Sequence, residues 1–323
     1  MGADDMSDAQ SKSQKILVIK LSAFGDFILA LGSMAAIRKQ HPEAEITLLT
    51  TPIFKELAER TGFCDKIELC KRYKWHDVTS WWKLRQFLRH GGFSRVYDLQ
   101  MNGRTKIMYR MLPKTAQKQF SGVVAGSNLF YPDPNWRDMH ALDRHKAVLK
   151  VAGIEDVTIP DMTWMDGDIS KFELKKPYVL LVPGCAPTRP DKKWPSKKYA
   201  GLAQKLDHEG YQAVLIGGPA EVAIGDEITM IAKNAVNLIG MTSFFDIAAL
   251  ARQASGAVGN DTGPIHLIAA SSCPTLTLFS SASNPEHSAP CGAAVKIIQA
   301  DDMADISLTD VMKAFEPRKI ASS

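Results

Sequence analysis

The second half of the chain contains the stretch GNDTGPIH, residues 259–266. An apolar run, residues 254–258, precedes it, and a second apolar run follows. This order predicts a strand, a tight turn and a helix, with Pro264 in the first helical turn, where no backbone N–H is needed. The N–H groups of Thr262 and Gly263 and the positive end of the helix dipole would face one point. The stretch therefore predicts a site for an anion such as pyrophosphate, although an ordinary capped turn has the same pattern.

The same alternation of short apolar runs and amphipathic stretches extends along nearly the whole chain. The runs predict strands at residues 15–20, 45–50, 66–70 and 95–100, and then at 178–183, 213–217, 235–239, 256–259 and 275–279. The amphipathic stretches predict helices at residues 27–40, 53–61, 78–90, 196–209, 221–233, 244–253 and 264–271. Strands that alternate with helices at this spacing indicate an α/β fold with a parallel sheet in each half.

A chain of 323 residues suits two domains. Residues 159–177, which separate the two series, hold prolines and acids without clear periodicity. We therefore expect a disordered leader (1–14), a first domain (15–160), a linker (161–176) and a second domain (177–323), with the last helix packing back on the first domain. Two doubly wound, Rossmann-like domains that face each other would form a ligand cleft at the carboxyl ends of their strands.

Composition excludes several classes of protein. With 45% hydrophobic and 23% charged residues and a net charge of +4, the chain is an ordinary globular protein rather than a dedicated nucleic-acid binder. Its five scattered cysteines include no C-x-x-C pair, which disfavours a zinc site or disulfide framework and fits a reducing cytosol. No apolar run is long enough to span a membrane, and the polar start is no signal peptide, so peripheral attachment stays open.

The first predicted strand leads into KLSAFGD, residues 20–26. Gly25 permits a tight turn there. Asp26 has two interpretations: a helix-capping aspartate, which is common, or a general base at the carboxyl end of the strand. The dinucleotide fingerprint G-x-G-x-x-G is absent, which argues against an oxidoreductase.

Two further loops follow strands of the second half. The loop PGCAPTRPDKKWP, residues 183–195, offers a hydroxyl, a guanidinium and two ammonium groups that suit phosphate oxygens, or it is a solvated basic loop. After paired glycines, Glu221 would accept hydrogen bonds from a ribose or base, or simply begin a helix. Met241 is by itself typical of core packing.

Taken together, these segments resemble the glycosyltransferase family 9 heptosyltransferases of lipopolysaccharide core synthesis. The resemblance covers nearly the whole chain after Lys15, and its blocks are residues 15–26, 98–100, 188–195, 217–221 and 240–266. It implies a GT-B fold, an ADP-activated heptose donor in the second domain and a lipid-linked sugar acceptor in the first. The implied reaction is an inverting transfer of heptose from ADP-heptose to the lipopolysaccharide inner core, on Kdo- or heptose-bearing lipid A.

The resemblance assigns roles by position. Asp26 matches the catalytic base and Lys192 the lysine on the donor phosphates. The matching donor contacts are Thr188, Glu221, Met241, Asp261, Thr262, Gly263 and His266. A second hydroxyl residue often precedes Thr188 in the family, whereas this chain has Pro187, which removes one phosphate hydrogen bond.

We expect basic side chains of the first half to bind the acceptor, namely those of Arg72, Lys74, Arg104 and Lys106. We expect no metal and no cofactor beyond the ADP-sugar substrate, because Asp166-Gly167-Asp168 follows no apolar strand and reads as an acidic turn. We expect cytoplasmic action at the inner face of a Gram-negative inner membrane, without nucleic acid. The alternatives are a GT-B enzyme for another nucleotide sugar and a catalytically silent nucleotide-binding relative.

Overall fold

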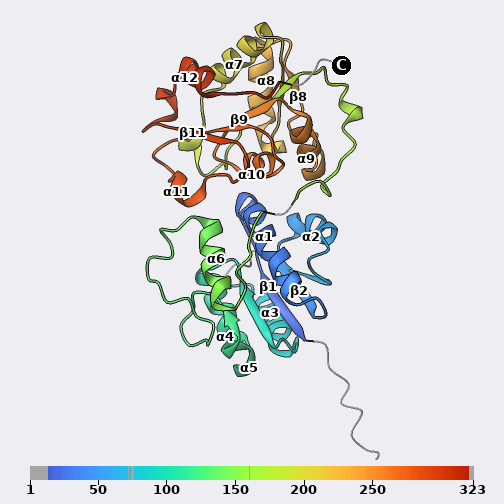
Figure 1. Cartoon of the computed structure of the whole chain (residues 1–323), viewed down its shortest axis with the longest axis vertical. Helices are drawn as coiled ribbons and strands as arrows, with labels where there is room; N and C mark the ends of the chain where they lie inside the picture. Colours follow the sequence, from blue (N-terminus) through green and yellow to red (C-terminus); the bar gives the residue numbers. More distant parts are fainter. Residues whose placement is uncertain (1–13, 72, 74–75, 160, 320–323) are drawn as a thin grey trace, which may run out of the picture. The chain divides into compact units, whose positions relative to one another are not determined.

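The computed structural model describes residues 14–71, 73, 76–159 and 161–319. It divides into two compact units (Figure 1). Within the described residues, unit 1 comprises the ranges 14–22, 33–133 and 145–157, and unit 2 comprises the ranges 23–32, 134–144 and 158–319. The first half of helix α1 (Phe24–Gln40) and the segment 134–144 therefore belong to unit 2, although they lie early in the chain.

Unit 1 is built on a parallel sheet with the strand order β3-β2-β1-β4-β5. Its strands are β1 (Lys15–Ile19), β2 (Glu45–Thr50), β3 (Lys66–Leu69), β4 (Arg95–Asp98) and β5 (Phe120–Ser121). Its other helices are α2 (Lys55–Thr61), α3 (Val78–His90), α4 (Gly103–Met111) and α5 (Lys114–Lys118), together with α6 (Ala141–Val151) from residue 145 onward. The four strands predicted in this half are confirmed. Strands β1, β2 and β4 are mostly buried, and strands buried on both faces read as apolar runs, whereas β3 is a largely exposed edge strand.

Helix α1 begins at Phe24, three residues before the predicted start. The carboxylate of Asp26 accepts a hydrogen bond from the backbone N–H of Ala23, at 3.3 Å between Oδ2 and N. Asp26 therefore lies inside the first turn, where a negative charge is favoured by the helix dipole.

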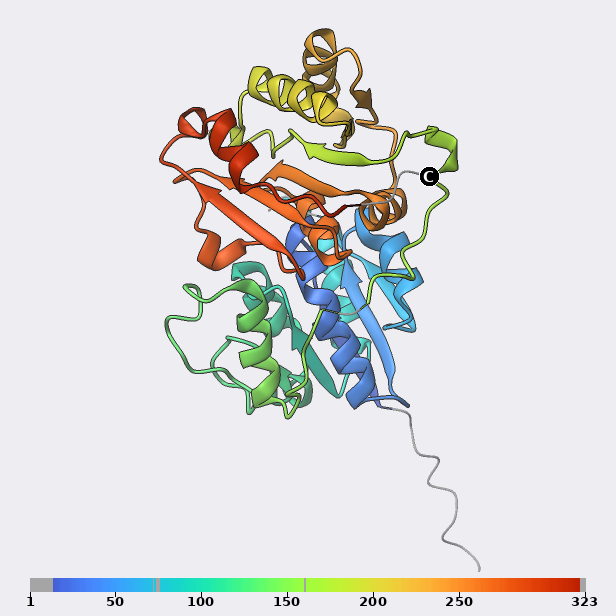
Figure 2. The ribbon, with the colours of Figure 1, turned by 45° about the horizontal axis from the view of Figure 1, so that its top comes forward.

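Unit 2 is built on a parallel sheet with the order β11-β10-β9-β6-β7-β8. Its strands are β6 (Tyr178–Val182), β7 (Gln212–Leu215), β8 (Val236–Asn237), β9 (Gly256–Asn260), β10 (Thr275–Phe279) and β11 (Val295–Gln299). Its helices are α7 (Ser196–His208), α8 (Val222–Ile231), α9 (Phe244–Gln253), α10 (Gly263–Ala270), α11 (Pro285–Ser288) and α12 (Leu308–Ala314). Figure 2 shows α7 and α8 on one side of this sheet and α9 and α10 on the other, the doubly wound arrangement.

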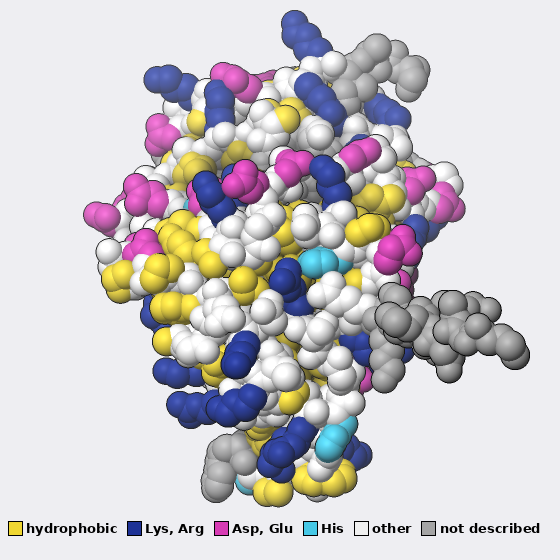
Figure 3. All heavy atoms as spheres, turned by 60° about the horizontal axis from the view of Figure 1, so that its bottom comes forward, with side chains coloured by type: hydrophobic (Ala, Val, Ile, Leu, Met, Phe, Trp, Pro, Cys, Tyr) yellow, Lys and Arg dark blue, Asp and Glu magenta, His cyan; other side chains and the backbone are white. Residues whose placement is uncertain are grey.

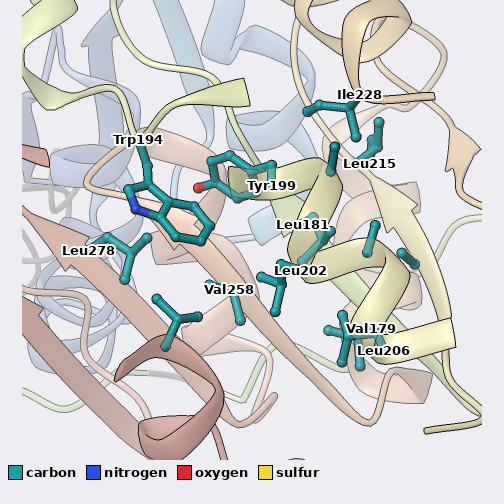
Figure 4. Packing of buried hydrophobic residues seen from close by; sticks show 14 of the residues in the cluster. Val179, Leu181, Trp194, Tyr199, Leu202, Leu206, Leu215, Ile228, Val258 and Leu278 are labelled. Atoms are coloured by element: carbon teal, nitrogen blue, oxygen red, sulfur yellow. The ribbon is translucent and has the colours of Figure 1, made fainter. Parts of the chain in front are cut away.

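The core of unit 2 lies between its sheet and α7 (Figure 4). Trp194 and Tyr199 are fully buried and meet edge to face, with ring centroids 4.8 Å apart. The indole N–H of Trp194 donates to the carbonyl of Ile306, so its one polar group is satisfied. Val311 and Phe315 join the same core. Helix α12 contacts α7 and β11 and so belongs to the core of unit 2. The sequence analysis had instead expected the last helix to pack back on the first domain.

Two further findings concern the chain as a whole. None of the five cysteines, all within the described residues, forms a disulfide bond. None of the helices in the described part of the chain combines the length and hydropathy needed to cross a membrane.

Candidate active site

The stretch that follows β9 forms the predicted strand, turn and helix. Thr262 is the N-cap of α10, with extended backbone angles (φ −149°, ψ 164°), and Pro264 lies in the first turn. The Thr262 side chain makes no capping hydrogen bond. Within the described residues, the N–H groups of Thr262 and Gly263 have no intramolecular acceptor. The start of α10 thus keeps the donors that an anion would need.

Asn260, the last residue of β9, fixes this turn to the loop at residues 183–195. It is fully buried. Its Nδ2 donates to the carbonyls of Pro183 and Gly184 at 2.9 and 3.1 Å. Its Oδ1 accepts from the backbone N–H of Trp194 at 3.2 Å and from the Tyr199 hydroxyl at 3.0 Å. Asn260 lies inside the stretch GNDTGPIH, but no local sequence pattern indicates this bridging role.

Lys192 and Asp261 form a tight ion pair at the carboxyl end of β9. Lys192 ends a short 3-10 helix (Pro190–Lys192), and its Nζ lies 2.6 Å from Oδ2 of Asp261. The two side chains are only 17% and 6% exposed. On the other side, Nε2 of His266 lies 3.8 Å from Oδ1 of Asp261, beyond direct hydrogen-bond range. Burial by itself raises the pKa of Asp261, but His266 and Lys192 outweigh it and lower that pKa to about 2.

Glu221 lies beside the start of the same loop. Its carboxylate accepts a hydrogen bond from the backbone N–H of Gly218. A Cβ at Gly184 would lie 2.6 Å from the carboxyl carbon of Glu221, so the loop and this side chain are in close contact. Burial raises the pKa of Glu221, while Gly218 and Lys193 act in the opposite direction. Glu221 is thus held in place by the turn after β7, where the sequence predicts a donor contact.

Two other predicted donor contacts are exposed. The side chain of Met241 is 63% exposed, which makes the core-packing interpretation wrong. Thr188 is also exposed, at the outer part of the loop. The N–H of Gly240, which precedes Met241, donates to the carbonyl of Gly217, so the segment with Met241 adjoins the turn after β7.

The first turn of α1 contacts the start of α10 within unit 2. A Cβ at Gly25 would lie 2.6 Å from Cδ2 of His266, and a Cβ at Gly263 would clash with the Phe24 ring. Phe24 also stacks on Phe244 of α9, with centroids 4.2 Å apart. Asp26, one residue after Gly25, is partly exposed. The structure therefore brings the predicted base close to the predicted anion site.

A second group of polar residues lies where β1 and β4 of unit 1 end. Gln100 accepts hydrogen bonds from the N–H groups of Leu21 and Ser22 at 2.8 and 2.9 Å. The Nζ of Lys20 donates to the carbonyl of Leu99 at 3.1 Å. Asp98 is fully buried, and burial raises its pKa to about 6. The roles of Lys20 and Gln100 were not predicted from the sequence, because they rest on contacts 78–79 residues apart.

The structure describes only half of the predicted acceptor contacts. Arg72 and Lys74 lie outside the described residues. Arg104 donates to the carbonyl of Lys71 at 2.7 Å, and its guanidinium lies 5.9 Å from the ring centroid of Tyr73. Lys106 is exposed on α4.

The two carboxylates of the acidic turn at residues 166–168 bind different partners. Asp166 pairs with Arg252 at 3.1 Å, and Asp168 accepts from the backbone and hydroxyl of Ser170. In the described ranges, no three acidic, histidine or cysteine side chains gather as a metal site would require.

Comparison with known proteins identifies the family and the fold. The family model described as glycosyltransferase family 9 (heptosyltransferase) matches residues 81–315. Lipopolysaccharide heptosyltransferase 2 of Salmonella typhimurium is 33% identical over 309 residues, which cover 88% of each chain.

Two solved structures share the fold over most of the chain. The family 9 glycosyl transferase of Veillonella parvula has a TM-score of 0.78 at 19% identity, covering 93% of this chain and 96% of the other. The E. coli ADP-heptose lps heptosyltransferase II has a TM-score of 0.71 at 22% identity, covering 93% and 97%. At such identities the likeness establishes the architecture alone.

Proposed function

Because the chain belongs to glycosyltransferase family 9 and has the GT-B fold of that family, we propose that it transfers heptose from ADP-heptose to the lipopolysaccharide inner core. The acceptor is Kdo- or heptose-bearing lipid A. The Salmonella relative is a lipopolysaccharide heptosyltransferase, and the E. coli structure is that of an ADP-heptose lps heptosyltransferase. The similarity to the first over 88% of the chain supports the same substrates here.

One observation carries the proposed catalytic arrangement: Gly25 packs on the ring of His266. This contact fixes the first turn of α1, and with it Asp26, against the helix whose N–H groups at Thr262 and Gly263 are free for an anion. A base next to a leaving-group site is what a single displacement requires. All of these groups lie within unit 2.

In this mechanism the donor diphosphate binds at the start of α10. The ammonium of Lys192 and the N–H groups of Thr262 and Gly263 stabilise the negative charge that develops on the departing ADP. Asp261 holds the ammonium in position through the 2.6 Å pair. Thr188, Glu221, Met241 and His266 provide the surrounding donor contacts.

Asp26 acts as general base. It takes the proton of the acceptor hydroxyl while the hydroxyl oxygen attacks the anomeric carbon from the face opposite ADP. The new glycosidic bond forms as the bond to the diphosphate breaks, and ADP leaves with the electron pair. The configuration at the anomeric carbon inverts, and no covalent enzyme intermediate is needed.

The decisive experiment replaces the base. We expect Asp26→Asn to lower kcat at saturating substrates about 10²- to 10⁴-fold, the usual contribution of a general base, while ADP still binds. Glu56→Gln is the matched control, because Glu56 is an exposed acid in the first turn of another helix, α2. Turnover of Asp26→Asn within a few-fold of wild type would overturn the assignment.

A panel of nucleotide sugars separates the alternatives. With a truncated lipopolysaccharide acceptor, release of ADP and a product heavier by one heptose support the proposal. Release from another nucleotide sugar indicates a different GT-B donor. Nucleotide binding without any transfer indicates a silent relative.

We also place the enzyme at the cytoplasmic face of the inner membrane, as a peripheral protein. Residues 71–118 contain twelve Lys and Arg but only two Asp, a net charge of +10, so the rest of a chain with net charge +4 carries −6. In Figure 3, Lys and Arg side chains gather in the lower part of the view, where few acidic ones are visible. A hollow of about 480 Å³ in this region is lined by Arg110, Lys114 and Lys118.

Such a basic region is attracted to anionic lipid headgroups. We expect sedimentation with phosphatidylglycerol vesicles at low salt, release as salt increases, and no binding to phosphatidylcholine vesicles. Equal binding to both lipids, or to neither, would contradict this location.

A further inference from the structure

Two phenylalanines stack at the start of helices α1 and α9 in unit 2. The ring centroids of Phe24 and Phe244 lie 4.2 Å apart, and the ring planes are inclined by 19°. Phe24 is the first residue of α1, and Phe244 is the first residue of α9. Stacked aromatic rings attract each other in addition to the gain from their burial. The pair therefore holds the beginnings of the two helices together.

The Phe24 ring also lies against the start of α10. A Cβ at Gly263, the first residue of that helix, would lie 2.4 Å from Cδ1 of Phe24 and 2.8 Å from its Cβ. The ring is thus in van der Waals contact with the residue whose N–H group is proposed to bind the donor diphosphate. A side chain at position 263 would displace the ring.

The proposed base lies at the same end of α1. The Asp26 carboxylate turns back to accept the hydrogen bond of the Ala23 N–H, at 3.3 Å between Oδ2 and N. The carboxylate therefore lies beside the residue that follows Ala23, which is Phe24. All of these residues belong to unit 2. The aromatic ring thus adjoins both the base and the leaving-group site.

Core packing does not account for the position of the two rings. The next phenylalanines on the same helices, Phe27 of α1 and Phe245 of α9, are 0% and 4% exposed. Phe24 and Phe244, in contrast, are both partly exposed. Their side chains carry no hydrogen-bond donor or acceptor, so rings in this position exclude water from a reaction site without binding it.

We propose that Phe24 and Phe244 form an aromatic wall that keeps water from the anomeric carbon of the donor, so that heptose passes to the acceptor hydroxyl and not to water. This inference rests on the proposed function and adds to it the means by which the site rejects a competing nucleophile. Phe24 is a shielding residue, which exchanges no proton and forms no bond with the substrates.

The reaction that the aromatic wall suppresses is hydrolysis of the donor. A water oxygen would form a bond to the anomeric carbon while the bond from that carbon to the diphosphate breaks. Asp26 would take one proton of the water, and ADP would leave with the electron pair. The products would be free heptose and ADP. Transfer and hydrolysis thus use the same base and the same anion site, and only the access of water separates them.

The ratio of transfer to hydrolysis tests the aromatic wall in purified full-length variants. Product formation with saturating acceptor measures transfer, and ADP release without acceptor measures hydrolysis. We expect Phe24→Ala to raise hydrolysis at least about tenfold and to lower transfer, because water then reaches the reacting carbon. Phe244→Ala should act in the same direction. Phe24→Leu, which keeps apolar bulk, should hydrolyse the donor less than Phe24→Ala.

Phe87→Ala is the matched control. Phe87 is also partly exposed and also pairs with a second phenylalanine, Phe93, at 5.4 Å between ring centroids, but it lies on α3 of unit 1. This variant should leave the ratio of transfer to hydrolysis unchanged. A loss of anchoring of α1 alone would lower both rates together. Opposite changes in the two rates are therefore specific to a wall.

Hydrolysis in heavy-oxygen water identifies the atom that water attacks. We expect Phe24→Ala to release ADP without the heavy isotope, because water attacks the anomeric carbon and the bridging oxygen stays with the phosphate. Heavy oxygen in the β-phosphate of the released ADP would show attack on phosphorus and would overturn the inference.

The same rates separate this inference from the proposed function. Opposite changes in transfer and hydrolysis support the aromatic wall even if Asp26→Asn remains active. Transfer by wild type with unchanged or lowered hydrolysis in folded Phe24→Ala and Phe244→Ala rejects the wall alone. If Phe24→Ala does not fold, Phe244→Ala and Phe24→Leu decide by the same two rates. Wild type that transfers no sugar rejects the proposed function, and the wall with it, since no reaction would then need shielding.

Discussion

Gly25 of α1 packs directly against the imidazole ring of His266 of α10. A Cβ built on Gly25 would lie 2.6 Å from Cδ2 and 2.9 Å from Cγ and Nε2 of that ring. These distances are shorter than any non-bonded carbon contact allows, so only glycine permits this approach. The contact determines how far Asp26 lies from the start of α10.

We predict that Gly25→Ala lowers kcat by about 10²-fold, because a shift of about 1 Å in a catalytic group costs that much. The added methyl group must push the first turn of α1 away from His266. Gly103→Ala is the control, since a Cβ there meets no atom within 4 Å. Steady-state ADP release measures both variants. Full activity in Gly25→Ala would show that the spacing of α1 and α10 is not critical.

Asn260 connects three segments through four hydrogen bonds, all of them buried. We predict that Asn260→Ala lowers the free energy of unfolding by about 3 kcal/mol, because it leaves several buried donors and acceptors unpaired at about 1–3 kcal/mol each. Urea unfolding of both proteins measures the difference. Asn234→Ala, which removes a single exposed hydrogen bond to Asp207, should cost well under 1 kcal/mol. Equal losses in the two variants would contradict the bridging role of Asn260.

The buried strands could be predicted because parallel strands covered on both faces are nearly all apolar, as in β6 and β10. Strand β11 was missed for the opposite reason. It is an edge strand with exposed positions, including Lys296, and its short run gives no continuous apolar signal. The start of α1 was also missed, because the capping contact between Asp26 and Ala23 favours an earlier first turn than hydrophobic periodicity indicates.

The candidate site was only partly predictable for a similar reason. The anion-binding turn is local in sequence, so GNDTGPIH predicts its backbone. The contact between Gly25 and His266 joins residues 241 positions apart, and no local pattern encodes it.

Lys192 has two roles that one substitution separates. We predict that Lys192→Met lowers kcat by about 10²- to 10³-fold, the usual cost of losing one group that stabilises a leaving anion. It should also lower the free energy of unfolding, because Asp261 becomes a buried charge without its closest partner. Lys192→Met/Asp261→Asn should recover part of the stability but none of the activity. Recovery of activity in the double variant would show that Lys192 acts only by neutralising Asp261.

We predict that turnover continues in excess chelator, because Lys192 and the start of α10 provide the positive charge that a divalent cation would provide elsewhere. The measurement is ADP release after dialysis against EDTA, with and without added Mg²⁺ or Mn²⁺. Rates within about twofold of each other are expected. Loss of activity that added metal restores would mean that a cation takes part in the reaction.

The pH dependence of stability follows from the Asp261 carboxyl, whose pKa is lowered to about 2 in the folded protein from the ordinary aspartate value of 3.8. A lowered folded-state pKa stabilises the protein above the unfolded pKa, and this stabilisation is lost as the pH falls through the folded value. The shift corresponds to about 2 kcal/mol at neutral pH, which should disappear progressively between about pH 4 and pH 2. The Asp261→Asn variant has no carboxyl group at this position. The difference in the free energy of unfolding between wild type and this variant should therefore narrow as the pH falls over that interval. Urea unfolding from pH 6 downward measures it, and a gap that stays constant across these pH values would show that Asp261 has an ordinary pKa.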